Sequence, residues 1–140
     1  MDKKILEQLK YDFHSHLGKT RSGEENSARQ MVEELEAFGI KKVGICSLSG
    51  NGVRPQNDLV YAAMQEFPGV VYGYADIDPK APDAMDEIHR TLGDMGMSGV
   101  KFMAWKHGYA VENCPQLGDV IDEIGKYDVF ILIHGGASPL

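Results

Sequence analysis

The chain has 140 residues, of which 43% are hydrophobic and 25% charged, and its formal net charge is -7. This size and composition are typical of one globular domain, so we expect a single domain over residues 1–140. The acidic balance, without an evident basic patch, argues against nucleic acid or an anionic membrane as a partner. The first residues include no long apolar run, so neither a signal peptide nor a membrane span is predicted.

The first predicted element is a strand over the stretch YDFHSHLG, residues 11–18. Asp12, His14 and His16 are spaced by two residues, and side chains on a regular strand alternate between faces, so we expect all three on one face. Two imidazoles and a carboxylate suit a divalent metal at the end of a sheet. The alternative is a polar strand end whose histidines bond to their neighbours, and the stretch alone leaves both open.

A polar loop over residues 19–26 and then a helix are expected next. Ser27 and Gln30 fit a capping box, which predicts the start of this helix, and Gly39 suits its end. Apolar residues at helical spacing predict its buried stripe. The stripe comprises Met31, Leu35 and Phe38.

The rest of the chain alternates between apolar strands and amphipathic helices. Strands are predicted at 42–48, 70–75, 100–104 and 129–134. Three helices lie between them: one capped by Asn57–Asp58, one over the apolar series 85–95, and one that starts at Pro115 with an inner stripe of Leu117, Val120, Ile121 and Ile124. Residues 49–52 and 105–109 are predicted as loops. The last strand is apolar nearly throughout, which predicts that both of its faces are covered.

Strands that alternate with helices predict right-handed βαβ units and a parallel sheet. In such α/β folds, ligands bind at the carboxyl ends of the strands. His14 and His16 lie toward that end of the first strand, and His134 lies at that end of the fifth. The coincidence favours the metal site over the polar strand end.

Cys46 and Cys114 lack the spacing of a Cys-x-x-Cys motif. Two isolated cysteines without a disulfide pattern indicate a reduced, cytoplasmic protein. Because Cys46 lies within an apolar run, we expect it to be a buried thiol.

With these residues placed, the sequence resembles the amidohydrolase superfamily, in particular the amidohydrolase-related group of metal-dependent hydrolases and decarboxylases. The segments that carry the resemblance follow the family's order of strands: YDFHSHLG, NDLVYAAMQEFPGVVYGYADIDP, MSGVKF and VFILIHGG. The resemblance implies an α/β fold made of the parallel βα units of a TIM-type (β/α)8 barrel. A complete barrel needs eight strands, so we expect this chain to be the amino-terminal portion of one, truncated after about five strands.

The resemblance implies that His14 and His16 bind a divalent metal ion, with zinc preferred, and that His134 binds it or positions the substrate. Asp12 is implied as a partner that orients a histidine. Lys101 matches the strand on which some amidohydrolases carry a carbamylated lysine, and an ordinary ion pair is the preferred interpretation here.

Four further residues are candidates for contact with a small-molecule substrate. Arg54 is placed to meet a carboxylate, and Trp105, His107 and Tyr109 are placed to line a pocket. An ordinary surface role is the alternative for each. The family's remaining histidine and its aspartate, the expected general base, belong to later strands and therefore lie beyond Leu140.

The first functional hypothesis is a metal-dependent hydrolase that activates water for attack on an amide, ester or lactone carbonyl. Decarboxylation of a small aromatic acid is the alternative on the same metal site. A phosphoesterase or nuclease also opens with such a strand, although the second strand end, CSLSGNG, supplies no further ligands. The fourth hypothesis is a truncated metal-binding domain without turnover. Exposed sheet edges would also favour self-association.

Overall fold

A computed structural model describes residues 10–19, 23, 25–47 and 52–135 of the chain. The chain divides into two compact units, Met1–Gly73 and Tyr74–Leu140. The strands follow the order β2-β1-β3-β4-β5-β6, in which every pairing is parallel except that of β2 with β1. Among the described helices, none combines the length and apolar character needed to cross a membrane.

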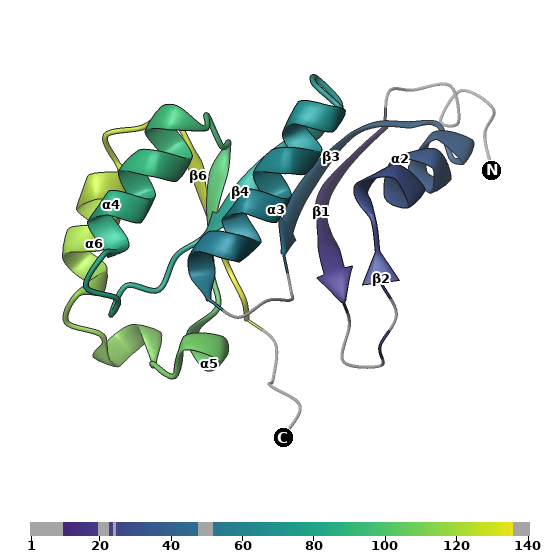
Figure 1. The fold of residues 1–140 in the computed structure, drawn as a ribbon. Helices are drawn as coiled ribbons and strands as arrows, with labels where there is room; N and C mark the ends of the chain where they lie inside the picture. The colour runs from purple at the N-terminus through teal and green to yellow at the C-terminus, as the bar shows by residue number, and fades with distance from the viewer. Residues whose placement is uncertain (1–9, 20–22, 24, 48–51, 136–140) are drawn as a thin grey trace. The chain divides into compact units, whose positions relative to one another are not determined.

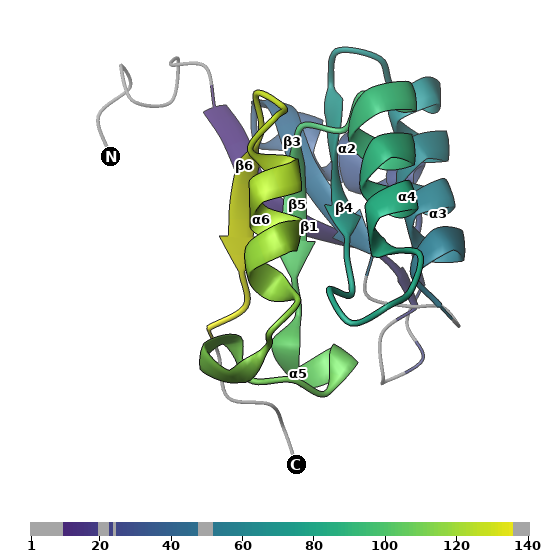
Figure 2. The same cartoon turned by 90° about the vertical axis from the view of Figure 1, so that its left-hand side faces the viewer.

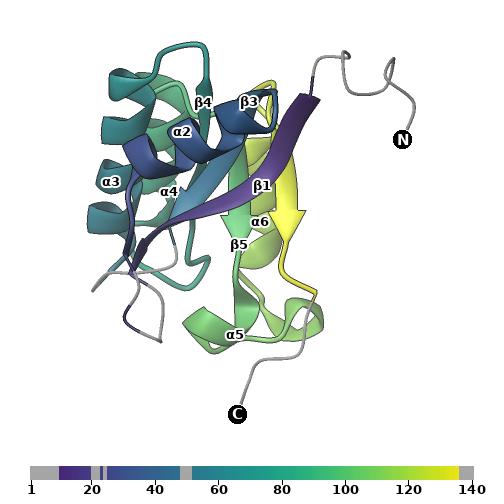
Figure 3. The same ribbon diagram turned by 90° about the vertical axis from the view of Figure 1, so that its right-hand side faces the viewer.

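The first unit places two helices against a parallel pair of strands (Figures 1 and 3). Its elements are β1 (Lys10–Lys19), β2 (Glu25–Asn26), α2 (Ala28–Ala37), β3 (Ile40–Ser47), α3 (Val53–Glu66) and the first residues of β4 (Val71–Asp76). Both helices pack on β3, whose residues from Val43 to Ser47 are all buried. The predicted loop over 19–26 is wrong at its end, because Glu25 and Asn26 pair with Lys19 and Gly18 as a short hairpin.

Helix α2 begins where the sequence predicts. The Ser27 side chain accepts from the backbone N–H of Gln30, and the Gln30 side chain accepts from the backbone N–H of Ser27, which completes the capping box. Gly39 ends the segment at φ 74°, a conformation that favours glycine. The predicted stripe is wrong at Phe38, which is 72% exposed because it follows the last helical turn.

Helix α3 begins four residues before the predicted cap at Asn57–Asp58. Gly52 precedes its first turn at φ 102°, and the Gln56 side chain donates to the Gly52 carbonyl at 2.8 Å. Pro55 is compatible with this start because the first turn of a helix leaves its N–H groups without intrahelical partners. Asn57 is therefore a buried helical residue, and the predicted cap is wrong.

The second unit places a helical layer on three parallel strands. Its elements are the end of β4, α4 (Ala84–Ile88), the π-helix η1 (His89–Asp94), β5 (Gly99–Phe102), α5 (Ala104–His107), the 3₁₀ turn η2 (Val111–Asn113), α6 (Leu117–Ile124) and β6 (Phe130–Ile133). Figure 2 shows α4 and α6 side by side, with α5 at the end of the unit where β5 finishes. Because α5 follows β5 after one residue, its side chains lie at the carboxyl ends of the strands.

Three expectations about the second unit are wrong. The predicted loop at 105–109 begins as the short helix α5. Ile121 is 40% exposed, since the buried side of α6 is Leu117, Val120 and Ile124. Strand β6 is only partly covered, with Ile133 49% exposed, because it is the last strand in the order and pairs only with β5 among the described residues. The predicted order of five parallel strands with intervening helices is confirmed.

Candidate metal site

Strand β1 contains an irregularity that decides which of its side chains share a face. Asp12 pairs with Val43, and Ser15 pairs with Ile45, so three steps along β1 match two steps along β3. This is the pattern of a β-bulge, in which one strand carries an extra residue. Asp12 and Ser15 consequently share a face, and the Ser15 hydroxyl donates to the Asp12 carboxylate at 2.6 Å.

The expected alignment of Asp12 with the two histidines is therefore wrong. The second carboxylate oxygen of Asp12 accepts from the backbone N–H of His14 at 3.0 Å. Asp12 fixes the backbone at the bulge, and both of these bonds go to its own strand. His14 and His16 are nevertheless neighbours, because a ring nitrogen of each and the Cys46 sulfur all lie within 4.8 Å of one another.

His14 and His16 meet a thiol from the neighbouring strand. Their ring centroids are 4.5 Å apart, with the ring planes inclined at 61°. His16 is the register partner of Cys46 on β3, and the Cys46 sulfur lies 3.8 Å from His14 Nε2. One donor atom from each of the three residues lies within 4.8 Å of the other two.

The three side chains fit a divalent metal ion in donor type and spacing. Imidazole nitrogen and thiolate sulfur bind zinc at about 2.0–2.3 Å, which separates tetrahedral ligand atoms by roughly 3.5 Å. The distance of 3.8 Å between His14 Nε2 and Cys46 Sγ is close to that separation. His14 is exposed, His16 is half-buried and Cys46 is fully buried, so the cluster is open to solvent on the histidine side.

Cys46 is the residue at this site that the sequence analysis missed. Its burial was predicted and is confirmed, with no exposed surface. Its proximity to the histidines follows from the register of β1 and β3, because His16 and Cys46 stand opposite each other. The signal in the sequence is the position of Cys46 near the carboxyl end of its strand, one residue before the end of β3, where His16 also lies on β1.

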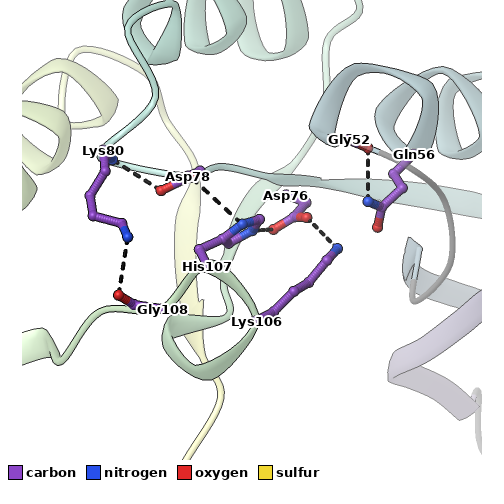
Figure 4. A network of polar contacts seen from close by, with 8 residues as sticks. All are labelled: Gly52, Gln56, Asp76, Asp78, Lys80, Lys106, His107 and Gly108. Carbon is purple, nitrogen blue, oxygen red and sulfur yellow. Dashed lines mark hydrogen bonds and ion pairs between the residues drawn. The ribbon is translucent and has the colours of Figure 1, made fainter.

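The second unit holds a separate polar cluster around Asp76, the last residue of β4 (Figure 4). The Asp76 carboxylate is buried and accepts from Lys106 Nζ at 2.7 Å and from His107 Nε2 at 2.9 Å. The other ring nitrogen of His107 lies 3.8 Å from Asp78. Lys80 donates to the carbonyl of Gly108 at 3.0 Å, which ties the same turn to the loop after β4.

Two of the predicted substrate contacts belong to this cluster. The His107 side chain is only 10% exposed and forms a hydrogen bond with Asp76. The Tyr109 hydroxyl is buried without a hydrogen-bond partner among the described residues. Burial raises the pKa of Tyr109 to about 12, and the charges of Cys114, Asp78 and Asp76 add to the effect.

Lys101 lies beside the same carboxylate along the sheet. It is 2% exposed, and its register partner on β4 is Asp76, so both side chains leave the same face of the two strands. A buried lysine next to a buried aspartate favours the ion-pair interpretation over the metal-ligand one.

Three further residues were predicted as part of the site: His134, Trp105 and Arg54. His134 follows β6 directly, and its backbone N–H donates to the Phe102 carbonyl at 3.0 Å. Its ring centroid is 5.9 Å from that of Trp105, which is 38% exposed. Arg54 is an exposed residue in the first turn of α3, in the first unit. The structure thus brings together His14, His16 and Cys46 in one unit and Trp105 and His134 in the other.

Comparison with solved structures finds the same fold in several enzymes. The match to 5-carboxyvanillate decarboxylase from Novosphingobium aromaticivorans, solved with bound manganese, has a TM-score of 0.76 at 14% identity over 96% of this chain and 53% of that chain. For 2,6-dihydroxybenzoate decarboxylase from Rhizobium the TM-score is 0.76 at 17% identity, over 95% and 51% of the two chains. For an amidohydrolase II structure it is 0.74 at 18% identity, over 94% and 52%.

The likeness is one of fold. No protein-family model matches the sequence, and a search of the curated proteins finds no match either. The chain spans about half the length of the structures it matches. It therefore shares its α/β fold with about half of each of these enzymes, which bear the fold of the amidohydrolase group that its sequence resembles.

Proposed function

We propose that this chain forms the metal-binding part of an amidohydrolase-type enzyme that acts on a small molecule. The observation that carries the proposal is the pair of neighbouring imidazoles on β1, held at 4.5 Å between ring centroids at the solvent-open side of a donor cluster. His14 and His16 would hold the ion, and His134 is proposed as a further ligand or as a group that positions the substrate.

A divalent ion at such a site supplies Lewis acidity, which lowers the pKa of water and polarises a carbonyl. The chain's own residues hold the site in place. The Asp12 carboxylate accepts from the backbone N–H of His14 and so fixes the strand beside the first imidazole. The reaction that we propose for this site is hydrolysis of an amide, ester or lactone.

Decarboxylation of a small aromatic acid is the second candidate. Two of the structures that share the fold are decarboxylases of substituted benzoates, and one of them was solved with manganese. The two candidates use the same ion, so metal binding tests both.

The test is metal binding by the full chain. We expect the metal-free protein to take up one zinc or manganese ion, measured by calorimetry and elemental analysis, and His14→Ala and His16→Ala to weaken binding by at least about 100-fold. His134→Ala tests the proposed further ligand. The matched control is His89→Ala, because His89 is an exposed histidine that pairs with Glu123.

Product analysis separates the two reactions. With lactones, esters and hydroxybenzoates offered in turn, hydrolysis adds water to the substrate, whereas decarboxylation releases carbon dioxide. Failure of the unmodified chain to bind any divalent ion would contradict the proposal.

A further inference from the structure

We infer that Cys46 is a metal ligand, so that the first unit provides a donor set of two histidines and one thiolate. The inference rests on the proposed metal site and extends it to a residue on a different strand. It also predicts which metal ion the site prefers. A thiolate favours zinc over manganese and magnesium, which prefer oxygen ligands.

The position of Cys46 is set by strand pairing. In a parallel pair, register partners lie on neighbouring strands about 4.8 Å apart, with their side chains on the same face. His16 and Cys46 are such partners, and the His14 ring, two residues earlier on β1, lies 4.5 Å from the His16 ring between centroids. The sheet backbone thus holds the thiol beside both imidazoles.

The distances are those of a site that needs only small side-chain rotations to close. Cys46 Sγ is 3.8 Å from His14 Nε2, and no pair of the three donor atoms exceeds 4.8 Å. A tetrahedral zinc ion brings such atoms to roughly 3.5 Å from one another. Imidazole rotation about its side-chain torsions supplies a change of this size, because those torsions are broad.

The three ligands differ in burial, and we expect them to differ in role accordingly. Cys46 has no exposed surface, so it would form the floor of the site, while the exposed His14 admits the ion from solvent. On binding, the thiol proton is released to the buffer and the sulfur lone pair forms the bond to the ion, with no change in oxidation state. Water or substrate takes the fourth position.

Cobalt(II) binding to the full, reduced chain tests the inference. A thiolate ligand gives a charge-transfer band in the near ultraviolet, whereas histidine ligands alone give only weak visible bands. We expect the charge-transfer band in the unmodified chain and in Cys114→Ser, the matched control at the other cysteine, which lies in the second unit. Cys46→Ser should lose the band and weaken zinc binding by at least about 100-fold.

X-ray absorption of the zinc-loaded, unmodified chain needs no variant and therefore stands even if Cys46→Ser does not fold. One sulfur scatterer at about 2.3 Å per zinc is expected. Cobalt that binds with visible bands but no charge-transfer band, or zinc with only nitrogen and oxygen neighbours, would overturn the role of Cys46 and leave the proposed function intact. A chain that binds neither ion would overturn both.

Discussion

The ring of His107 lies 2.9 Å from the buried carboxylate of Asp76, joined through Nε2 and Oδ1. Lys106, the preceding residue, reaches the other carboxylate oxygen at 2.7 Å. One buried aspartate at the end of β4 thus holds two consecutive residues of α5. The short helix has four residues, so these contacts stabilise it far more than its own backbone bonds can.

Asp76→Asn should destabilise the second unit. The amide keeps the shape of the side chain but removes the negative charge that pairs with Lys106. Disruption of a buried ion pair costs about 3–5 kcal/mol, and less here because Lys106 reaches solvent. We expect a loss of about 2–4 kcal/mol in urea denaturation. Fluorescence of Trp105, the single tryptophan, reports on α5 directly.

The matched control for this variant is Asp94→Asn, at an exposed aspartate near the end of η1. A surface change of this kind should alter the unfolding free energy by no more than about 0.5 kcal/mol. Equal effects of the two variants would contradict the structural role of Asp76.

Tyr109 should make the protein lose stability at alkaline pH. Its pKa is raised from 10.0 to about 12, so between these values the unfolded chain loses the phenolic proton while the folded chain keeps it. The stabilisation is therefore complete below pH 10 and is lost as pH rises toward 12. Because the ring is partly exposed, we discount the shift to a loss on the order of 1 kcal/mol.

Tyr109→Phe should remove this alkaline loss in thermal melts recorded across the same pH range. At pH 8 the variant should be as stable as the original or slightly more so, because it deletes a buried hydroxyl that has no partner among the described residues. Tyr11→Phe is the control, at a tyrosine that is 57% exposed. If Tyr109→Phe still lost the same stability at alkaline pH, the loss could not be assigned to Tyr109.

Gly99→Ala should disrupt the pairing of β5 with β6. An added Cβ would lie 2.8 Å from two ring atoms of Phe130 and 3.1 Å from its carbonyl oxygen. The ring has little room to move, since it packs edge-to-face on Tyr74 at 4.7 Å between centroids. Overpacking of this kind costs about 1–3 kcal/mol, measurable by thermal or urea denaturation.

Gly118→Ala provides the contrast within the same unit. Nothing lies within 4 Å of a Cβ at this position of α6, so alanine should stabilise the helix by about 0.5–1 kcal/mol. We therefore expect Gly99→Ala to lower the free energy of unfolding and Gly118→Ala to raise it. A neutral Gly99→Ala would mean that Phe130 packs differently.

Ser27→Ala should weaken the start of α2. The Ser27 oxygen accepts from the Gln30 backbone N–H at 3.2 Å and its hydroxyl donates to the Gln30 side chain at 2.9 Å. Loss of such a cap costs about 1 kcal/mol. Ser27→Asn retains an acceptor at the cap and should keep most of the stability, so similar losses in both variants would argue against the capping role.

The order of elements could be predicted from the sequence because it depends on local signals. Apolar strands and the start and stop signals of helices are visible in a single sequence. The Ser27 cap is an example, because its two partners, Ser27 and Gln30, are only three residues apart. The α3 start was mispredicted because Asn57 and Asp58 are good caps in isolation. The competing signal was Gly52 followed by Pro55 in the first turn.

The site could be predicted only in part, because its geometry depends on strand register. His14 and His16 were visible as a motif, whereas Cys46 looked like an ordinary core thiol until β3 was aligned with β1. Regular alternation placed Asp12 with the histidines and failed at the bulge. The partners of Asp76 come from α5, which the sequence showed only as a polar loop.

The bulge divides β1 into an irregular step, between Asp12 and Ser15, and a regularly paired end, from Ser15 to Leu17. Ser15, His16 and Leu17 are each paired with β3, so strand pairing positions His16, whereas His14 lies within the irregular step between Asp12 and Ser15. Phe13 falls in the unpaired step and is 58% exposed. The position of His14 therefore depends on the hydrogen bond from its backbone N–H to Asp12 as well as on strand pairing, so a residue gained or lost in this step would displace His14 while leaving His16 opposite Cys46.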